Sequence, residues 1–190
     1  MEKDFELDLS NALDALRSGG VILYPTDTIW GLGCDACNQE AVAKIYSIKK
    51  REDSKSMLSL VGSRSMLADW VSEIPEKLKR IMDEYDTPVT CIYPTPVNLA
   101  ENLLADDGSA GLRVTGEDFS SRLCLAFGKP IVSTSANISG KAAPRFFDEV
   151  ENEIRDKVDY IVRYRQDDTT PRSASRIVKI LPDNTVLTIR

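Results

Sequence analysis

The chain contains no histidine, and this absence removes several kinds of catalytic site. A Ser-His-Asp or Cys-His device, a histidine general base and a histidine-ligated metal all require an imidazole ring. Neither a GxxxxGK[ST] phosphate loop nor a GxGxxG dinucleotide fingerprint occurs in the sequence. Any chemistry must therefore rest on lysine, arginine, carboxylates, hydroxyls, backbone amides or a bound ion.

Long hydrophobic runs are also missing, since no segment reaches the roughly 18 apolar residues that a membrane helix requires. The first ten residues are acidic and lack the basic and apolar regions of a signal peptide. These features predict a cytoplasmic protein with no membrane partner. The formal net charge of −6 argues against a broad basic surface for nucleic acid, although it is compatible with a local basic pocket.

Cysteine is scarce, with four residues in the chain of 190. Cys34 and Cys37 form a lone CxxC pair, whereas Cys91 and Cys124 lie in apolar segments. Zinc usually needs four ligands, so small buried side chains explain these cysteines better than a metal or redox role. We therefore predict no protein-ligated metal.

Segments typical of strands and helices alternate irregularly along a chain long enough for one sizeable core. Apolar runs predict strands at 21–24, 57–61, 89–94, 109–114, 158–162 and the start of 130–140, and a terminal hairpin of RIVKI and TVLTI around LPDN. Helical spacing predicts helices at 9–16 (capped by Ser10), 39–50, 64–71, 75–85, 118–127 and 146–157. This order predicts a single α/β domain over residues 1–190, with helices flanking a twisted mixed sheet rather than a doubly wound one.

Two clusters of small polar side chains follow apolar runs. Residues 24–33 read YPTDTIWGLG, and residues 130–140 read PIVSTSANISG. Such residues often form only a strand end and a capped turn. They can equally form a polar cradle at the end of a strand, where α/β folds usually bind ligands. Both interpretations stay open for each cluster taken alone.

Basic residues form a third cluster at the end of the helix predicted for 39–50. Lys49, Lys50 and Arg51 stand there, with Lys55 shortly after. Cations near a helix C-terminus are favourable by themselves and usually form a solvated face. Arg113 differs, because its apolar neighbours mean that it either snorkels or faces a polar cavity. If all these groups line one surface, that surface suits a substrate with several negative charges.

The segments PTDTIWGLG, KKREDSK, SAGLRV and STSANISG, taken in this order, resemble the YrdC family of threonylcarbamoyl-AMP synthases over about Gly20 to Arg190. The resemblance implies a YrdC-like α/β domain with a large, concave, positively charged groove. It also implies a nucleotidyltransferase that converts L-threonine, bicarbonate or CO2 and ATP into threonylcarbamoyl-adenylate and pyrophosphate. A partner transferase complex would then pass the threonylcarbamoyl group to an adenosine of tRNA, and direct binding of tRNA by this chain stays open.

The resemblance also implies roles for individual residues. On the threonine side these are Thr28, Arg113 for the carboxylate, and Ser175. On the ATP and phosphate side these are Lys49, Arg51, Lys55, Ser109, Ser133, Ser135, Asn137, Lys141 and Arg190. The chain departs from the family pattern at Glu52, where proline is common, and at Arg176, where threonine is common. No residue is assigned as a general base.

The implied chemistry suits a chain without histidine. A threonine carbamate is itself a nucleophile that can attack the α-phosphorus of ATP, so the protein need not supply one. The protein must hold mutually repelling anions together, with Mg²⁺ on the phosphate oxygens. An alternative function is a non-catalytic RNA-binding or ribosome-maturation factor that uses the same groove. The net charge and the scarcity of interleaved aromatic and basic residues argue against that alternative.

Overall fold

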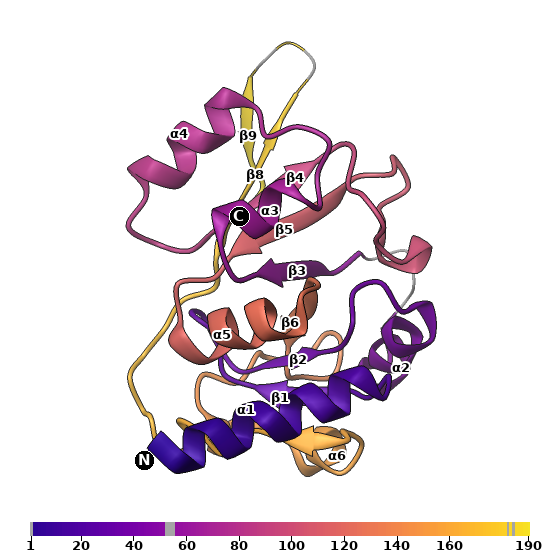
Figure 1. Cartoon of the computed structure of the whole chain (residues 1–190), viewed down its shortest axis with the longest axis vertical. Helices are drawn as coiled ribbons and strands as arrows, with labels where there is room; N and C mark the ends of the chain where they lie inside the picture. Colours follow the sequence, from indigo (N-terminus) through magenta and orange to yellow (C-terminus); the bar gives the residue numbers. More distant parts are fainter. Residues whose placement is uncertain (1, 52–55, 182, 184) are drawn as a thin grey trace.

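The computed structural model of the protein describes residues 2–51, 56–181, 183 and 185–190. In this part of the chain, nine strands form one sheet in the order β7-β1-β2-β6-β3-β5-β4-β8-β9 (Figure 1). The strands are β1 (Ile22–Tyr24), β2 (Gly31–Gly33), β3 (Leu58–Val61), β4 (Val89–Tyr93), β5 (Ala110–Val114), β6 (Ile131–Ser135), β7 (Tyr160–Ile161), β8 (Arg176–Ile180) and β9 (Val186–Thr188). The pairs β1–β7, β3–β5 and β4–β8 are parallel and the other pairs are antiparallel, which confirms the predicted mixed sheet.

The helices surround this sheet. They are α1 (Glu2–Arg17), α2 (Gln39–Lys49), α3 (Arg64–Ala68), α4 (Glu76–Glu84), α5 (Asp118–Phe127) and α6 (Asn152–Arg155), with 3-10 turns η1 (Glu101–Leu103) and η2 (Phe147–Glu149). Within the described residues, every helix is too short or too polar to cross a bilayer.

Two helix predictions were wrong. α1 begins well before Ser10, so Ser10 lies inside the helix and does not cap it. The segment 146–157 is not one helix, because Val150 and Glu151 adopt extended backbone angles between η2 and α6. This break lets the Val150 side chain enter a hydrophobic cluster of the core, where it is 2% exposed.

Helices cover both faces of the half of the sheet that contains β1, β2 and β6 (Figure 1). Side chains alternate along β1, so Ile22 and Tyr24 join the hydrophobic cluster of α1 and α5, whereas Leu23 joins the cluster of α2. The rings of Phe5 in α1 and Phe119 in α5 meet edge-on with their centroids 5.3 Å apart. This half of the sheet is therefore buried on both faces.

The strand β2 was not predicted, because Gly-Leu-Gly has little propensity for a strand. The structure explains the second glycine. A Cβ atom on Gly33 would lie 2.6 Å from Cε1 of Tyr24 and 2.9 Å from the carbonyl oxygen of Val132. Glycine therefore lets the Tyr24 ring and β6 approach β2 closely, while Leu32 between the two glycines is fully buried.

The other half of the sheet, made of β3, β5, β4 and β8, has α3 and α4 on one face (Figure 1). Cys91, Leu112 and Val178 from its strands share a hydrophobic cluster with Leu67 of α3 and Leu78 of α4. Residues that alternate with them along the strands point to the opposite face. That opposite face carries the candidate site.

The polar segment 162–175 connects β7 to β8 and so links the two halves of the sheet. Its start is held by Asp8 of α1, whose carboxylate is 3% exposed. Asp8 Oδ2 accepts hydrogen bonds from the backbone N–H groups of Arg163 (2.9 Å) and Tyr164 (2.7 Å), and Oδ1 accepts one from the Tyr160 hydroxyl. One buried acid thus fixes where this segment leaves β7.

We predict that Asp8→Ala lowers the free energy of unfolding by about 3 kcal/mol, because two buried backbone N–H groups lose their acceptor. Urea denaturation measures this change. The matched control is Asp14→Ala, which removes an exposed carboxylate from the same helix and should change stability by less than about 0.5 kcal/mol. Equal effects of the two substitutions would contradict the anchoring role of Asp8.

Candidate functional site

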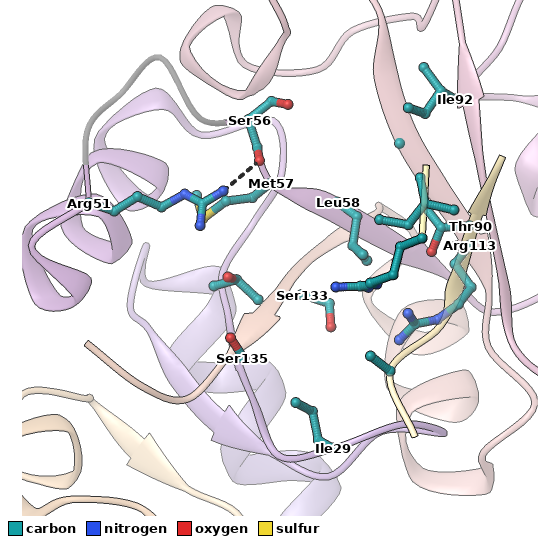
Figure 2. Close-up of a pocket in the computed structure, with 15 residues that line it drawn as sticks. Ile29, Arg51, Ser56, Met57, Leu58, Thr90, Ile92, Arg113, Ser133 and Ser135 are labelled. Atoms are coloured by element: carbon teal, nitrogen blue, oxygen red, sulfur yellow. Dashed lines mark hydrogen bonds between the residues drawn. The ribbon is translucent and has the colours of Figure 1, made fainter. Parts of the chain in front are cut away.

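A cavity of about 250 Å³ lies on this opposite face, where β3, β4, β5, β6 and β8 come together. Five residues assigned from the sequence line it: Arg51, Arg113, Ser133, Ser135 and Arg190. Figure 2 shows Arg51 and Arg113 on opposite sides of the cavity, with Ser133 and Ser135 between them. Among the described residues that line the cavity, every charged side chain is an arginine.

The floor of the cavity follows from the two-residue period of the strands. Thr90 and Ile92 of β4 and Gly111 and Arg113 of β5 line it, because they alternate with residues of the core. A Cβ atom on Gly111 would lie 3.2 Å from Cγ2 of Thr90, so glycine keeps this part of the floor low. Because side chains alternate along β5, the sheet itself directs Arg113 to the cavity side.

Arg113 is 2% exposed and faces the polar cavity, which answers the question that the sequence left open. Its Nη2 atom lies 2.9 Å from Asp27 Oδ1 and donates a long hydrogen bond of 3.4 Å to Thr28 Oγ1. The Thr28 hydroxyl also shares a hydrogen bond of 2.9 Å with Thr26. Arg113 Nε is buried and has no hydrogen-bond partner among the described residues. Nε is therefore a buried donor that lacks an acceptor in the protein without ligand.

Lys49 does not line the cavity, although the resemblance implied contact with ATP. Its ammonium is buried and donates hydrogen bonds to the carbonyl oxygens of Ser135 and Asn137, the latter at 2.8 Å. The Lys49 carbonyl in turn accepts the N–H of Ser139 at 2.8 Å. Burial, together with the nearby Arg51 charge, lowers the pKa of Lys49 to about 8. Lys49 therefore fixes the end of β6 and the loop that follows it, rather than facing the cavity.

Six further assigned residues are absent from the described cavity lining. Two of them, Thr28 and Ser175, contact residues that line it, Arg113 and Thr90 respectively. Asn137 donates hydrogen bonds to the carbonyl oxygens of Lys141 (2.7 Å) and Ile138 (3.1 Å), so it shapes its own loop. The Ser109 hydroxyl is buried and donates to the Asp107 carboxylate. Lys141 is exposed and paired with Glu151 at 2.7 Å. Lys55 lies outside the described residues.

Ser175 and Arg190 meet at the end of the cavity formed by β8. The buried Ser175 hydroxyl shares a hydrogen bond of 2.9 Å with Thr90, and Arg190 Nε donates to the Ser175 carbonyl at 3.1 Å. Burial, and then the charge of Arg113, lower the pKa of Arg190. Arg113 and Arg190 line the same cavity, so an anion between the two guanidinium groups would be stabilised.

The sequence analysis missed Arg165, which joins three segments of the chain. Its side chain is 15% exposed and pairs with Glu117 at 3.2 Å and Asp168 at 3.0 Å. Its Nη1 atom also donates to the carbonyl of Thr26 at 3.2 Å. Arg165 therefore fixes the loop that carries Thr28. The mixture of arginines and aspartates in 163–172 was the available signal, because such alternation often indicates an ion-pair network.

Comparison with known proteins identifies the class of this α/β protein. Residues 14–190 match the Sua5_yciO_yrdC family model, which is described as "Telomere recombination". The chain therefore belongs to the Sua5/YciO/YrdC family, which confirms the resemblance read from its motifs. The threonylcarbamoyl-AMP synthase of Vibrio cholerae serotype O1 is 34% identical over 158 residues, which are 82% of this chain and 84% of that protein. The protein of the same name from Blochmanniella pennsylvanica is 32% identical over 154 residues, which are 80% and 79% of the two chains.

Solved structures confirm the fold. P. abyssi Sua5 complexed with L-threonine superposes with a TM-score of 0.84 at 22% identity and covers 96% of this chain. E. coli YciO superposes with a TM-score of 0.82 at 23% identity, covering 98% of this chain and 89% of its own. The chain spans about half the length of the P. abyssi protein, since the match covers 53% of that chain.

The buried ammonium group of Lys49 predicts that the stability of the protein depends on pH. The folded pKa of about 8 lies below the ordinary value of 10.5, so the unfolded state binds more protons between these values. The free energy of unfolding should therefore rise with pH in this window, and Lys49→Met should remove that part of the rise. Denaturation curves from pH 8 to pH 10.5 measure it. The control Lys50→Met removes the neighbouring exposed lysine and should keep the wild-type slope. Parallel curves for all three proteins would contradict the buried charge of Lys49.

Proposed function

We propose that this chain is a threonylcarbamoyl-AMP synthase that joins L-threonine, bicarbonate or CO2 and ATP into threonylcarbamoyl-adenylate and releases pyrophosphate. One observation carries the proposal: a buried arginine with a partnerless Nε lines a cavity whose other charged lining residues, among those described, are also arginines. The names of the curated relatives and the L-threonine complex of P. abyssi Sua5 support it. The product would serve a tRNA-modifying transferase complex.

Arg113 would bind the carboxylate of L-threonine. Its guanidinium is held by the sheet and by Asp27, and its buried Nε lacks the acceptor that a substrate carboxylate would supply. Thr28 and Ser175 lie next to it, Thr28 through its contact with Arg113 and Ser175 through its contacts with Thr90 and Arg190. Their hydroxyls would distinguish a hydroxylated amino acid from one without the hydroxyl.

The triphosphate of ATP would lie between Arg51 and Arg190, above Ser133 and Ser135. Guanidinium groups and hydroxyls are both donors to phosphate oxygens. Lys49 and Asn137 would act through the loop that they shape rather than by direct contact. Contact of Lys55, Ser109 and Lys141 with nucleotide stays a proposal that rests on the resemblance alone.

Mg²⁺ fits this site as a companion of ATP. The described lining residues offer the hydroxyls of Ser133, Thr134 and Ser135 but no carboxylate, and the described residues hold no group of three or more acidic, cysteine or histidine ligands. Such a donor set suits Mg²⁺ that stays on phosphate oxygens and keeps most of its water. When bound there, the ion would neutralise charge on the phosphates.

The proposed chemistry depends more on holding the reactants in position than on acid–base groups of the protein. The carboxylate of a threonine carbamate attacks the α-phosphorus, a new P–O bond forms, and pyrophosphate leaves with the electrons of the broken P–O bond. The arginines would hold the anionic reactants together and stabilise charge on the α-phosphoryl oxygens. Since β5 already places Arg113, that group would need little rearrangement.

Pyrophosphate release from ATP by the purified protein, with bicarbonate and Mg²⁺, tests this function. We predict release that requires L-threonine, and Arg113→Lys should raise the KM for L-threonine by about 30-fold or more because a lysine cannot make the bidentate contact. The control Arg122→Lys changes an exposed arginine and should leave the KM unchanged.

A folded wild-type protein that releases no pyrophosphate in response to L-threonine would overturn the proposed function. The non-catalytic RNA-binding alternative would then become the leading explanation of the cavity. It predicts tight tRNA binding with a steep salt dependence.

A further inference from the structure

Arg165 has a backbone conformation that residues other than glycine rarely adopt. Its φ angle is 64°, in the left-handed region, and its side chain is 15% exposed. An arginine stays in such a conformation only where the surrounding contacts determine it. Arg165 is also absent from the lining of the candidate cavity, so the proposed mechanism gives it no direct part.

The three partners of the Arg165 guanidinium lie on three separate segments. Glu117 belongs to the loop that leaves β5, Thr26 to the turn that follows β1, and Asp168 to the polar segment that connects β7 to β8. Each of these three parts of the chain leads to one residue proposed for L-threonine. Those residues are Arg113 on β5, Thr28 in the turn and Ser175 immediately before β8.

The contact with Thr26 reaches Thr28 through short hydrogen bonds. Arg165 Nη1 donates to the Thr26 carbonyl at 3.2 Å. The buried Thr26 hydroxyl accepts the N–H of Thr28 at 3.1 Å and shares a hydrogen bond of 2.9 Å with the Thr28 hydroxyl. Arg113 donates to that same Thr28 hydroxyl at 3.4 Å. A displacement of Thr26 would therefore move the Thr28 hydroxyl relative to Arg113.

The contact with Glu117 ties the same guanidinium to the loop that follows β5. Glu117 is 8% exposed, and its Oε2 accepts the backbone N–H of Ser120 at 2.8 Å, which caps α5. A buried carboxylate that loses its charged partner is strongly destabilised. Among the described residues, the ion pair of Glu117 is with Arg165. The charge of Arg165 therefore holds this loop and the turn with Thr28 together.

The residues proposed for the phosphates stand apart from these contacts. Arg51 follows α2, whereas Ser133 and Ser135 lie on β6. The three contacts of Arg165 reach neither α2 nor β6. A change at Arg165 should therefore act on the amino-acid side of the cavity and spare the phosphate side.

We propose that Arg165 is a positioning residue of the amino-acid subsite, which holds Thr28 and the loop after Arg113 in the arrangement that binds L-threonine. The inference rests on the proposed function and deepens it, because it assigns to one residue the binding of L-threonine but not that of ATP. Arg165 would touch neither substrate and acts through Thr26 and Glu117.

Dissociation constants for L-threonine and for ATP with Mg²⁺, measured separately by ligand-observed NMR titration, test the proposal. Arg165→Gly removes the side chain but keeps a residue that adopts the left-handed angle freely, so it separates the contacts from the turn. We expect this variant to bind L-threonine about tenfold more weakly and to bind ATP within about twofold of the wild type. The control Arg163→Met removes an exposed arginine of the same segment and should leave both constants unchanged.

A double-mutant cycle tests whether Arg165 acts through Thr28. Thr28→Val removes the hydroxyl that Thr26 and Arg113 contact, so it should weaken L-threonine binding by itself. Adding Arg165→Gly to Thr28→Val should then cost less than about threefold, because the hydroxyl that Arg165 positions is already gone. A full tenfold loss on top of Thr28→Val would contradict action through Thr28.

Arg165→Lys keeps a positive charge beside Glu117, so it serves if Arg165→Gly leaves that carboxylate unpaired and does not fold. A lysine lacks the planar fork that meets three partners, and it should still weaken L-threonine binding by about threefold with ATP binding unchanged. Equal losses for the two ligands, or no loss in a folded variant, would overturn the positioning role and leave the proposed function standing. A wild type that binds ATP but not L-threonine would overturn both.

Discussion

Desolvation of buried cations is the constraint on which the site depends. A guanidinium or ammonium group taken out of water must find oxygen partners inside the protein. Arg113 finds Asp27, and Lys49 finds the carbonyl oxygens of Ser135 and Asn137. Each buried cation therefore fixes a polar loop against the end of a strand. Charge therefore helps to hold the two polar clusters of the sequence in place, together with the core packing of their apolar residues.

The same constraint explains why the cavity suits anions. The protein has a net charge of −6, yet the described charged residues that line this cavity are arginines. Burial, and then the like charge of Arg113, lower the pKa of Arg190, so both desolvation and repulsion disfavour its charged form. An anionic ligand would relieve this repulsion, and Arg113, Ser133 and Ser135, which strands carry, would need little reorganisation to meet it.

The sequence predicts the elements whose signals are local. The helix at 118–127 and the terminal hairpin match the structure, because a glycine stop and period-two alternation act over a few residues. β2 escaped prediction because its glycines are explained by Tyr24, a contact formed only in the folded sheet. The motifs singled out Arg113 and Ser133, and the structure places both in the lining of one cavity. The motifs could not show that Lys49 binds the loop after β6 instead of lining the cavity. The packing of α2 decides which of Lys49, Lys50 and Arg51 is buried.

A crystal structure of the protein with L-threonine and a non-hydrolysable ATP analogue tests the central claim most directly. The account predicts the threonine carboxylate on Arg113 and the phosphates between Arg51 and Arg190. A complex in which both ligands bind and Arg113 contacts neither of them would contradict it.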